Sequence, residues 1–289
     1  MARRPGTLVI IGGHEDKEGD KLILRAVAER AGSKLVVATV ASQGHGDELW
    51  KEYERIFRNL GVPHVYHLSI DSREEAKSER KARILDDATA VFFTGGDQLK
   101  ITSQLGDSAV YQRVLDVFEH GGLIAGTSAG ASVMCETMIV RANGSETYRI
   151  GATMQMAPGL GIARGVIIDQ HFAERGRITR LVGAVAQNPR ILGIGIDEDT
   201  AILMRRRQFT VLGAGGVYVV DGKDVVYSNI GEAQADRALS TFNLRLHLLS
   251  MGDRFDITTR KASARPAEEL EKALLGSAHD GASAEDGED

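Results

Sequence analysis

Cysteine, proline and aromatic residues are all scarce in this 289-residue sequence. The single cysteine, Cys135, excludes an internal disulfide and any metal site built from several thiolates. No apolar run approaches the roughly 20 residues that a helix needs to span a bilayer, so we expect no membrane partner. The N-terminus passes directly into Thr7–Ile11, which is too short for the apolar region of a signal peptide. We therefore expect a cytoplasmic protein.

A surplus of positive charge is also absent. The chain has 35 lysines and arginines against 40 aspartates and glutamates, for a net charge of −5 at pH 7. Nucleic-acid-binding proteins usually carry a basic patch, so we expect no nucleic-acid partner. The one basic cluster, Arg205–Arg207, is better interpreted as a solvated turn or strand edge. Hydrophobic residues make up 43% of the chain, which is ordinary for a globular protein and allows a sizeable core.

Short apolar segments alternate with helical patterns in the first half of the chain. The expected strands cover residues 8–11, 35–40, 65–68, 90–93 and 123–125, and the expected helices cover residues 21–31, 48–60, 74–85 and 111–120. Such alternation predicts right-handed crossovers and a parallel sheet covered on both faces. Ligands bind these sheets at the carboxyl ends of the strands, so the turns after Ile11, Phe93 and Ala125 are expected to share one rim.

The pattern changes beyond Met138. Strands at residues 166–168 and 191–196 flank a helix predicted over 173–187, and short antiparallel strands follow at residues 201–204, 209–212, 217–220, 224–228 and 244–249. From residue 262 the chain is polar and helical in pattern. We expect one α/β domain over residues 1–275 and an acidic, disordered tail over residues 276–289.

The segment Gly126–Gly130 fits the motif G-x-S-x-G, in which a serine lies on a sharp strand-to-helix turn. Its glycines allow the close backbone approach that such a turn needs. The hydroxyl of Ser128 then lies at a helix N-terminus, where the free N–H of Ala129 can stabilise an oxyanion formed when the serine attacks a carbonyl. The turn Gly95–Gly96 can supply further donors. The alternatives are an incidental serine and an ordinary turn.

A serine nucleophile needs a base, and the base needs a group that orients it. His171 is the best base because it ends an apolar strand at the rim, although a structural histidine is the alternative. The adjacent carboxylates of Asp197–Asp199 end another strand, so one of them can orient His171 unless they form a solvated turn. This order of serine, histidine and acid differs from that of the α/β-hydrolases.

Three arginines fall at the start of the helix predicted over residues 173–187, namely Arg175, Arg177 and Arg180. Cations at a helix N-terminus oppose the helix dipole, which costs a few tenths to about 1 kcal/mol each when exposed. Either solvation and Glu174 offset this cost, or the arginines bind substrate carboxylates beside His171.

Five sequence blocks lie in order between about residue 7 and residue 260: Gly12–Lys17, Phe92–Gln98, Gly126–Ala131, Asp169–Phe172 with the three arginines, and Gly195–Ala201. Together they are specific, and the chain resembles the serine peptidase family that contains cyanophycinase and α-aspartyl dipeptidase. The resemblance implies a class I glutamine-amidotransferase-like α/β sandwich with a largely parallel central sheet and a small antiparallel C-terminal part. It also implies a homodimer.

For activity, the resemblance implies a serine exopeptidase that hydrolyses cyanophycin to β-Asp-Arg dipeptides through an acyl-enzyme, without metal or cofactor. Cyanophycin is a polyaspartate whose side-chain carboxyls carry arginine in isopeptide linkage. Carried over to this chain, Ser128 is the nucleophile, His171 the general base and then acid, and Glu198 the orienting carboxylate. The oxyanion donors are the N–H groups of Gly96 and Ala129. The substrate-contacting positions are Gln98, Asp169, Gln170, Arg175, Arg177 and Arg180.

One departure from the family pattern is His14, where a small residue such as alanine is expected; if its loop lines the site, His14 alters the fit. The substrate guanidinium needs an anion, for which Glu15, Asp16 and Asp169 are candidates. Two alternative functions for the chain are a related peptidase that acts on short Asp-X peptides and a noncatalytic binding module on the same scaffold. A nucleotide-binding protein is disfavoured, because neither glycine-rich loop has phosphate-binding spacing.

Overall fold

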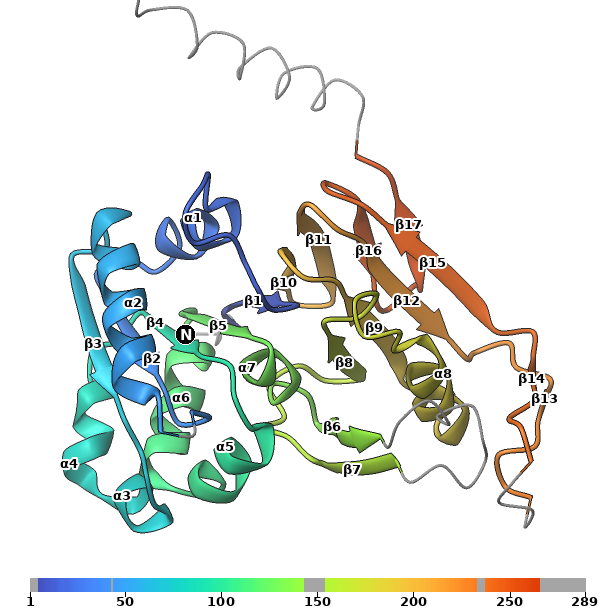
Figure 1. The fold of residues 1–289 in the computed structure, drawn as a ribbon, viewed down its shortest axis with the longest axis horizontal. Helices are drawn as coiled ribbons and strands as arrows, with labels where there is room; N and C mark the ends of the chain where they lie inside the picture. Colours follow the sequence, from blue (N-terminus) through green and yellow to red (C-terminus); the bar gives the residue numbers. More distant parts are fainter. Residues whose placement is uncertain (1–4, 43, 143–153, 233–236, 266–289) are drawn as a thin grey trace, which may run out of the picture.

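The computed structural model describes residues 5–42, 44–142, 154–232 and 237–265 (Figure 1). The acidic tail expected over residues 276–289 and the domain limit expected at residue 275 lie outside these ranges. Within the described ranges, no helix combines the length and apolar character needed to cross a bilayer.

Parallel strands form one half of a nine-stranded sheet with the order β17-β16-β11-β10-β1-β5-β4-β2-β3. These strands are β1 (Thr7–Ile11), β2 (Lys34–Ala38), β3 (His64–Leu68), β4 (Ala90–Phe93) and β5 (Leu123–Thr127). Their mutual pairings are all parallel. The parallel sheet predicted from the alternation of strands and helices is therefore confirmed in this half, and with it the mixed α/β fold.

Helices cover both faces of this parallel half. On one face lie α1 (Leu22–Ala28) and α2 (Gly46–Asn59), and on the other lie α3 (Arg73–Lys77), α5 (Gln98–Leu105) and α6 (Ala109–Glu119). Successive residues of β1 alternate between the two cores: Val9 and Ile11 belong with α1 and α2, whereas Leu8 and Ile10 belong with the opposite layer. Burial of each such side chain contributes about 1.5–3 kcal/mol to folding.

The antiparallel part lies beside β1 and is larger than predicted. It continues the nine-stranded sheet through β10 (Thr200–Arg205), β11 (Gln208–Gly213), β16 (Arg254–Asp256) and β17 (Lys261–Ser263). A second sheet has four strands, β8 (Val166–Gln170), β9 (Leu192–Ile196), β12 (Val217–Asp221) and β15 (Arg245–Leu249), and α8 (Ile178–Gln187) covers its outer face. In Figure 1 these elements run from yellow to red, starting with β10 beside β1 and extending away from β2, β3 and β4.

Several expected boundaries were wrong. The helix predicted over residues 74–85 is broken into α3, α4 (Glu79–Ala82) and a 3-10 turn, η1 (Arg83–Leu85), because Ser78 is extended, with ψ of 123°. The helix predicted from residue 173 begins only at Ile178, because Gly176 has a left-handed backbone with φ of +57°. Lys261–Ser263 form β17, so the helical pattern predicted from residue 262 is wrong at its start, and its continuation from residue 266 lies outside the described ranges. The strand predicted over residues 224–228 is confirmed only at its end, as β13 (Tyr227–Ser228). The elements that the sequence did not reveal are α5, β6 (Thr137–Ala142) and β7 (Met154–Pro158), β14 (Thr241–Phe242), which pairs with β13, and β16.

Candidate active site

A cleft of about 710 Å³ opens at the carboxyl ends of the parallel strands. The turns after β1, β4 and β5 all line it, through His14, Gly95–Gly96 and Ser128 respectively. His171, which follows β8, lines the same cleft. The prediction that these turns share one rim is therefore confirmed, although β5 continues to Thr127 instead of ending at Ala125.

Ser128 occupies the sharp turn between β5 and the short helix α7 (Ala129–Ser132). Its backbone, with φ of 54° and ψ of −112°, lies in a sparsely populated region. Both flanking glycines are required by packing: a Cβ on Gly126 would lie 2.5 Å from the carbonyl oxygen of Gly130, and one on Gly130 would lie 2.4 Å from that of Phe93. The turn thus projects the serine hydroxyl into the cleft.

The hydroxyl of Ser128 meets the buried ring of His171, with 2.9 Å between Oγ and Nε2. On the other side of the ring, Nδ1 donates to Glu198 Oε1 over 2.5 Å. Because a carboxylate can only accept, this bond fixes the proton on Nδ1 and leaves Nε2 free to accept from the serine. Burial lowers the pKa of His171 below 6.5, although the Glu198 hydrogen bond opposes that shift. His171 is therefore neutral near pH 7 and can take the serine proton.

Of the three adjacent carboxylates, Glu198 is the one that contacts His171. The side chain of Asp197 accepts instead from the backbone N–H groups of Ala173 and Gly216, and Asp199 accepts from that of Asp16. Partial burial disfavours ionisation of Glu198, but hydrogen bonds from His171 and His14 hold its pKa below the usual value. Glu198 is thus ionised when it orients His171.

The turn after β1 holds the backbone of all three segments together. The carbonyl of Ile11 accepts from the N–H of Ser128 (3.1 Å), and that of Gly12 accepts from the N–H of His171 (2.8 Å). The carbonyl of Gly13 accepts from the N–H of Asp199, next to Glu198, over 2.9 Å. Gly13 also has φ of +106°, and a Cβ there would lie 2.3 Å from His171 Cε1. This turn sets the spacing of the serine, histidine and glutamate.

The predicted oxyanion donors flank the serine. Ala129 is the first residue of α7, where the N–H groups have no partner inside the helix. Gly95 lies against Ser128, because a Cβ on Gly95 would be 3.4 Å from that of the serine. Gly96 follows with φ of +139°, and a Cβ on it would strike the carbonyl of Ala41. Gly95 thus allows the backbone to approach Ser128 closely, and Gly96 is required by its packing against Ala41.

Two of the three arginines surround Asp169, a carboxylate that is only 1% exposed. Arg180 binds it through two nitrogens, with 2.6 Å from Nε to Oδ2, and Arg177 Nη1 lies 3.2 Å from Oδ1. Burial lowers the pKa of Arg177 to about 10, and Asp169 counteracts this shift. Because α8 begins at Ile178, only Arg180 lies inside the helix, and Asp169 rather than Glu174 compensates its charge.

The cleft wall brings together most of the predicted substrate positions. Its lining includes Gln98, Gln170, Arg175, Arg177 and Arg180. Asp169 is not among the described residues that line it. The guanidinium of Arg175 has no hydrogen bond or ion pair with any residue in the described ranges.

Among the acids considered for a guanidinium, Glu15 alone lies on the described cleft wall. It is buried and accepts hydrogen bonds from Tyr53 (2.5 Å) and Thr127 (2.6 Å). Asp16 instead accepts from backbone N–H groups of its own loop.

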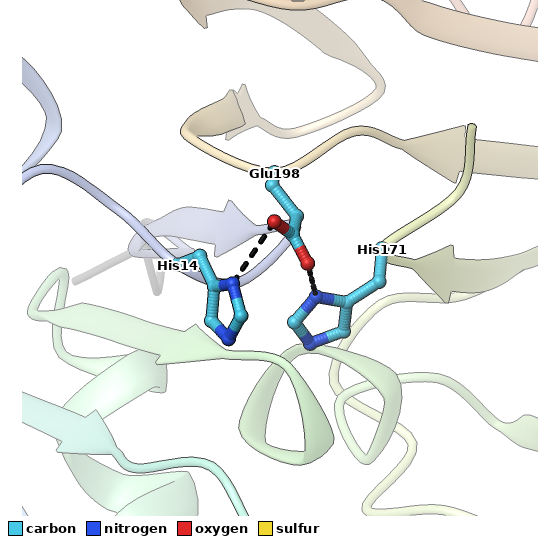
Figure 2. A group of neighbouring side chains, drawn as sticks. All are labelled: His14, His171 and Glu198. Carbon is cyan, nitrogen blue, oxygen red and sulfur yellow. Dashed lines mark hydrogen bonds and ion pairs between the residues drawn. The ribbon is translucent and has the colours of Figure 1, made fainter. Parts of the chain in front are cut away.

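The sequence did not reveal the contact of His14 with Glu198. His14 Nδ1 donates to Glu198 Oε2 over 2.9 Å, so the carboxylate is bonded to two imidazoles (Figure 2). The position of His14 directly after the rim turn Gly12–Gly13 was the available signal. Among the described residues, this group is also the one whose ligand atoms, all within 4.8 Å of one another, are spaced for a metal ion.

Comparison with known proteins agrees with this geometry. The model of Peptidase family S51 matches residues 8–212. The chain is 40% identical over 257 residues to the cyanophycinase of Trichormus variabilis, covering 88% of this chain and 86% of that protein. It is 38% identical over 260 residues to the cyanophycinase of Synechococcus elongatus, covering 89% and 80% respectively. A peptidase from an acI-B1 actinobacterium shares the fold, with a TM-score of 0.67, 20% identity, and coverage of 89% of this chain and 98% of that one. The chain belongs to peptidase family S51 and is a serine-type peptidase.

Proposed function

We propose that this peptidase hydrolyses cyanophycin and releases β-Asp-Arg dipeptides as an exopeptidase. The observation that carries the proposal is a hydrogen-bonded serine, histidine and glutamate at one end of a cleft whose wall also presents three arginine side chains. Cyanophycin carries a free arginine α-carboxylate on every residue, which suits such a wall. The similarity to proteins named cyanophycinase supports the same substrate.

In the proposed reaction, Ser128 Oγ attacks the carbonyl carbon of the scissile amide while its proton passes to His171 Nε2. The negative charge that develops on the carbonyl oxygen is stabilised by the N–H groups of Gly96 and Ala129. His171 then gives its proton to the leaving amine, and the acyl-enzyme forms. Water attacks the acyl-enzyme by the same route, with His171 as base, and restores the serine hydroxyl. Glu198 stabilises the charged imidazole in both halves.

The wall residues divide the recognition of the substrate between them. Arg175 and the outward N–H groups of Arg177 and Arg180 bind arginine carboxylates, whereas Gln98 and Gln170 offer neutral polar contacts. Glu15 is the acid that meets the substrate guanidinium. Asp169, which the resemblance makes a substrate position, holds Arg177 and Arg180 in place.

We expect Arg175→Gln to raise KM for cyanophycin by about 10- to 100-fold, because one charge-assisted hydrogen bond contributes about 1.5–3 kcal/mol. The melting temperature should stay unchanged, since this guanidinium has no partner among the described residues. Arg55→Gln, at an exposed position of α2, is the matched control and should leave KM unaltered. An unaltered KM in Arg175→Gln would remove Arg175 from the substrate site.

We expect Gly13→Ala to lower kcat/KM by about a hundredfold, because the added methyl displaces the ring of His171 and a misplacement of about 1 Å has this effect. Gly61→Ala is the control: Gly61 also has a positive φ, +85°, but nothing lies within 4 Å of a Cβ there. Both variants carry backbone strain of about 1–2 kcal/mol. Steady-state kinetics report the displacement of His171, and thermal melts report the backbone strain. Equal kcat/KM in both variants would show that the added methyl group does not displace His171.

Purified protein incubated with cyanophycin, with products identified by mass spectrometry, tests the proposed function directly. Release of β-Asp-Arg is the expected result. If none is released, a panel of short Asp-X peptides is tested next. Their hydrolysis would indicate a related peptidase that uses the same serine, histidine and glutamate. Polymer binding without hydrolysis of either substrate would favour a noncatalytic binding module.

We further propose that the enzyme is a homodimer in the cytoplasm and has no nucleic-acid or membrane partner. Support for the dimer comes from the resemblance and from β15, the outermost strand of the four-stranded sheet, where Leu246 and Leu248 are exposed. Sedimentation velocity with Leu246→Glu as the comparison tests it: a wild-type monomer would contradict the proposal. Fractionation of the source cells tests the location.

A further inference from the structure

The imidazole of His14 lies beside that of His171, and each ring bonds to a different carboxylate oxygen of Glu198. Its Nδ1 donates to Oε2 over 2.9 Å, while His171 Nδ1 donates to Oε1 (Figure 2). The two rings also touch edge to face, with 5.0 Å between their centroids and an angle of 80° between their planes. His14 therefore contacts both members of the pair that activates the serine.

The backbone around His14 fixes the direction of this ring. His14 has φ of +46°, an uncommon conformation for a residue other than glycine. The preceding turn is bonded to the segments that carry Ser128, His171 and Glu198, and two residues later the N–H of Asp16 donates to Asp199 Oδ1. His14 is thus held in its strained conformation by backbone hydrogen bonds on both sides of it, in the preceding turn and at Asp16.

Glu198 needs such a partner because its own side chain is partly exposed to solvent. Its side chain is 26% exposed, whereas that of His171 is 4% exposed. A carboxylate at a solvent-facing turn rotates readily and bonds to water, which draws Oε1 away from His171. A second donor at Oε2 opposes that rotation, and it leaves His14 itself largely in solvent, with 72% of its side chain exposed.

We propose that His14 is a positioning residue, which holds the Glu198 carboxylate so that Oε1 stays on His171 and thereby sustains the basicity of Nε2 toward Ser128. The inference rests on the proposed roles of Ser128, His171 and Glu198. It does not depend on the substrate. His14 neither touches the nucleophile nor exchanges a proton in the reaction, so its effect falls on the chemical step rather than on binding.

The reaction of Ser128 with a fluorophosphonate probe tests this role without a peptide substrate. In that reaction the Oγ–P bond forms, the P–F bond breaks with loss of fluoride, and the serine proton passes to His171. We expect His14→Ala to slow labelling by about tenfold, as for the loss of a hydrogen bond to a charged group. His14→Asn, whose amide nitrogen can replace Nδ1 as donor, should recover the rate to within about threefold. His120→Ala, at the exposed C-terminal end of α6, is the control and should label at the wild-type rate.

Kinetics with cyanophycin provide the second measurement, in which His14→Ala should lower kcat by a similar factor and leave KM within about twofold. A wild-type labelling rate in His14→Ala would overturn the proposal. Equal losses of labelling rate in the Ala and Asn variants would also overturn it, because they would indicate that His14 acts only through packing of its loop. If the wild-type enzyme labels and the His14 series behaves as expected, but cyanophycin is not cleaved, the substrate assignment fails and the role of His14 stands. A wild-type enzyme that does not label overturns both the serine assignment and this inference.

Discussion

Ser128→Ala is expected to abolish hydrolysis of cyanophycin while the fold and the affinity for the polymer persist. The substitution removes one oxygen and keeps the Cβ, so it introduces no new clash at the turn between β5 and α7. Without Oγ no acyl-enzyme can form, and loss of a serine nucleophile lowers kcat on the order of 10⁶-fold. The proposed oxyanion donors and the three arginines of the cleft wall, Arg175, Arg177 and Arg180, are untouched, so binding should be retained.

The measurement compares product release, polymer binding and thermal melting in the wild type and the variant. Ser132→Ala removes a hydroxyl from the short helix α7, which directly follows Ser128, and serves as the matched control, with activity within about twofold of the wild type. Loss of folding in Ser128→Ala would instead indicate that the serine is needed only for the turn. Substantial residual hydrolysis would place the nucleophile elsewhere in the cleft.

The parallel half of the fold could be predicted because its signals are local. Except for the edge strand β3, each strand is a short apolar run that is buried on both faces, such as Ala90–Phe93, and each is separated from the next by a helix. The hairpin β6–β7 gives no such signal, since the residues of Met154–Pro158 are only partly buried or exposed. Helix α5 follows directly on a glycine turn, and Asp97, which caps it by accepting from the N–H of Leu99, is the signal that could have located its start.

The residues of the candidate site also divide into those that a local sequence signal places and those that it does not. Ser128 and His171 could be placed from the sequence because each stands at the end of an apolar strand. The choice among Asp197, Glu198 and Asp199 could not be made from residue type, because it depends on the directions of three successive side chains around a turn in which Asp199 has φ of +44°. Contacts between loops that are distant in the sequence, such as that of His14, leave no periodic pattern to detect.

Asp169→Asn is expected to produce the largest loss of stability among these variants, about 3–5 kcal/mol in the free energy of unfolding. Asparagine keeps the volume of the side chain but removes its charge. Arg177 and Arg180, each with a side chain only 12% exposed, would then be held in a low-dielectric environment without their counterion. Removing one partner of a buried ion pair has this effect because the remaining charge is left unpaired.

Urea denaturation measures the loss, and Asp224→Asn is the matched control. Asp224 pairs with Arg245 at the surface, where the side chains are 31% and 55% exposed, and an ion pair of this kind contributes at most about 1 kcal/mol. If both variants lost the same small amount, Asp169 would not be the structural anchor of the arginines. A variant with wild-type stability but a raised KM for cyanophycin would make Asp169 a direct substrate contact. The combination expected from the geometry is a large loss of stability together with a raised KM, since Arg177 and Arg180 can present ordered N–H groups to a substrate carboxylate only while Asp169 fixes their other faces.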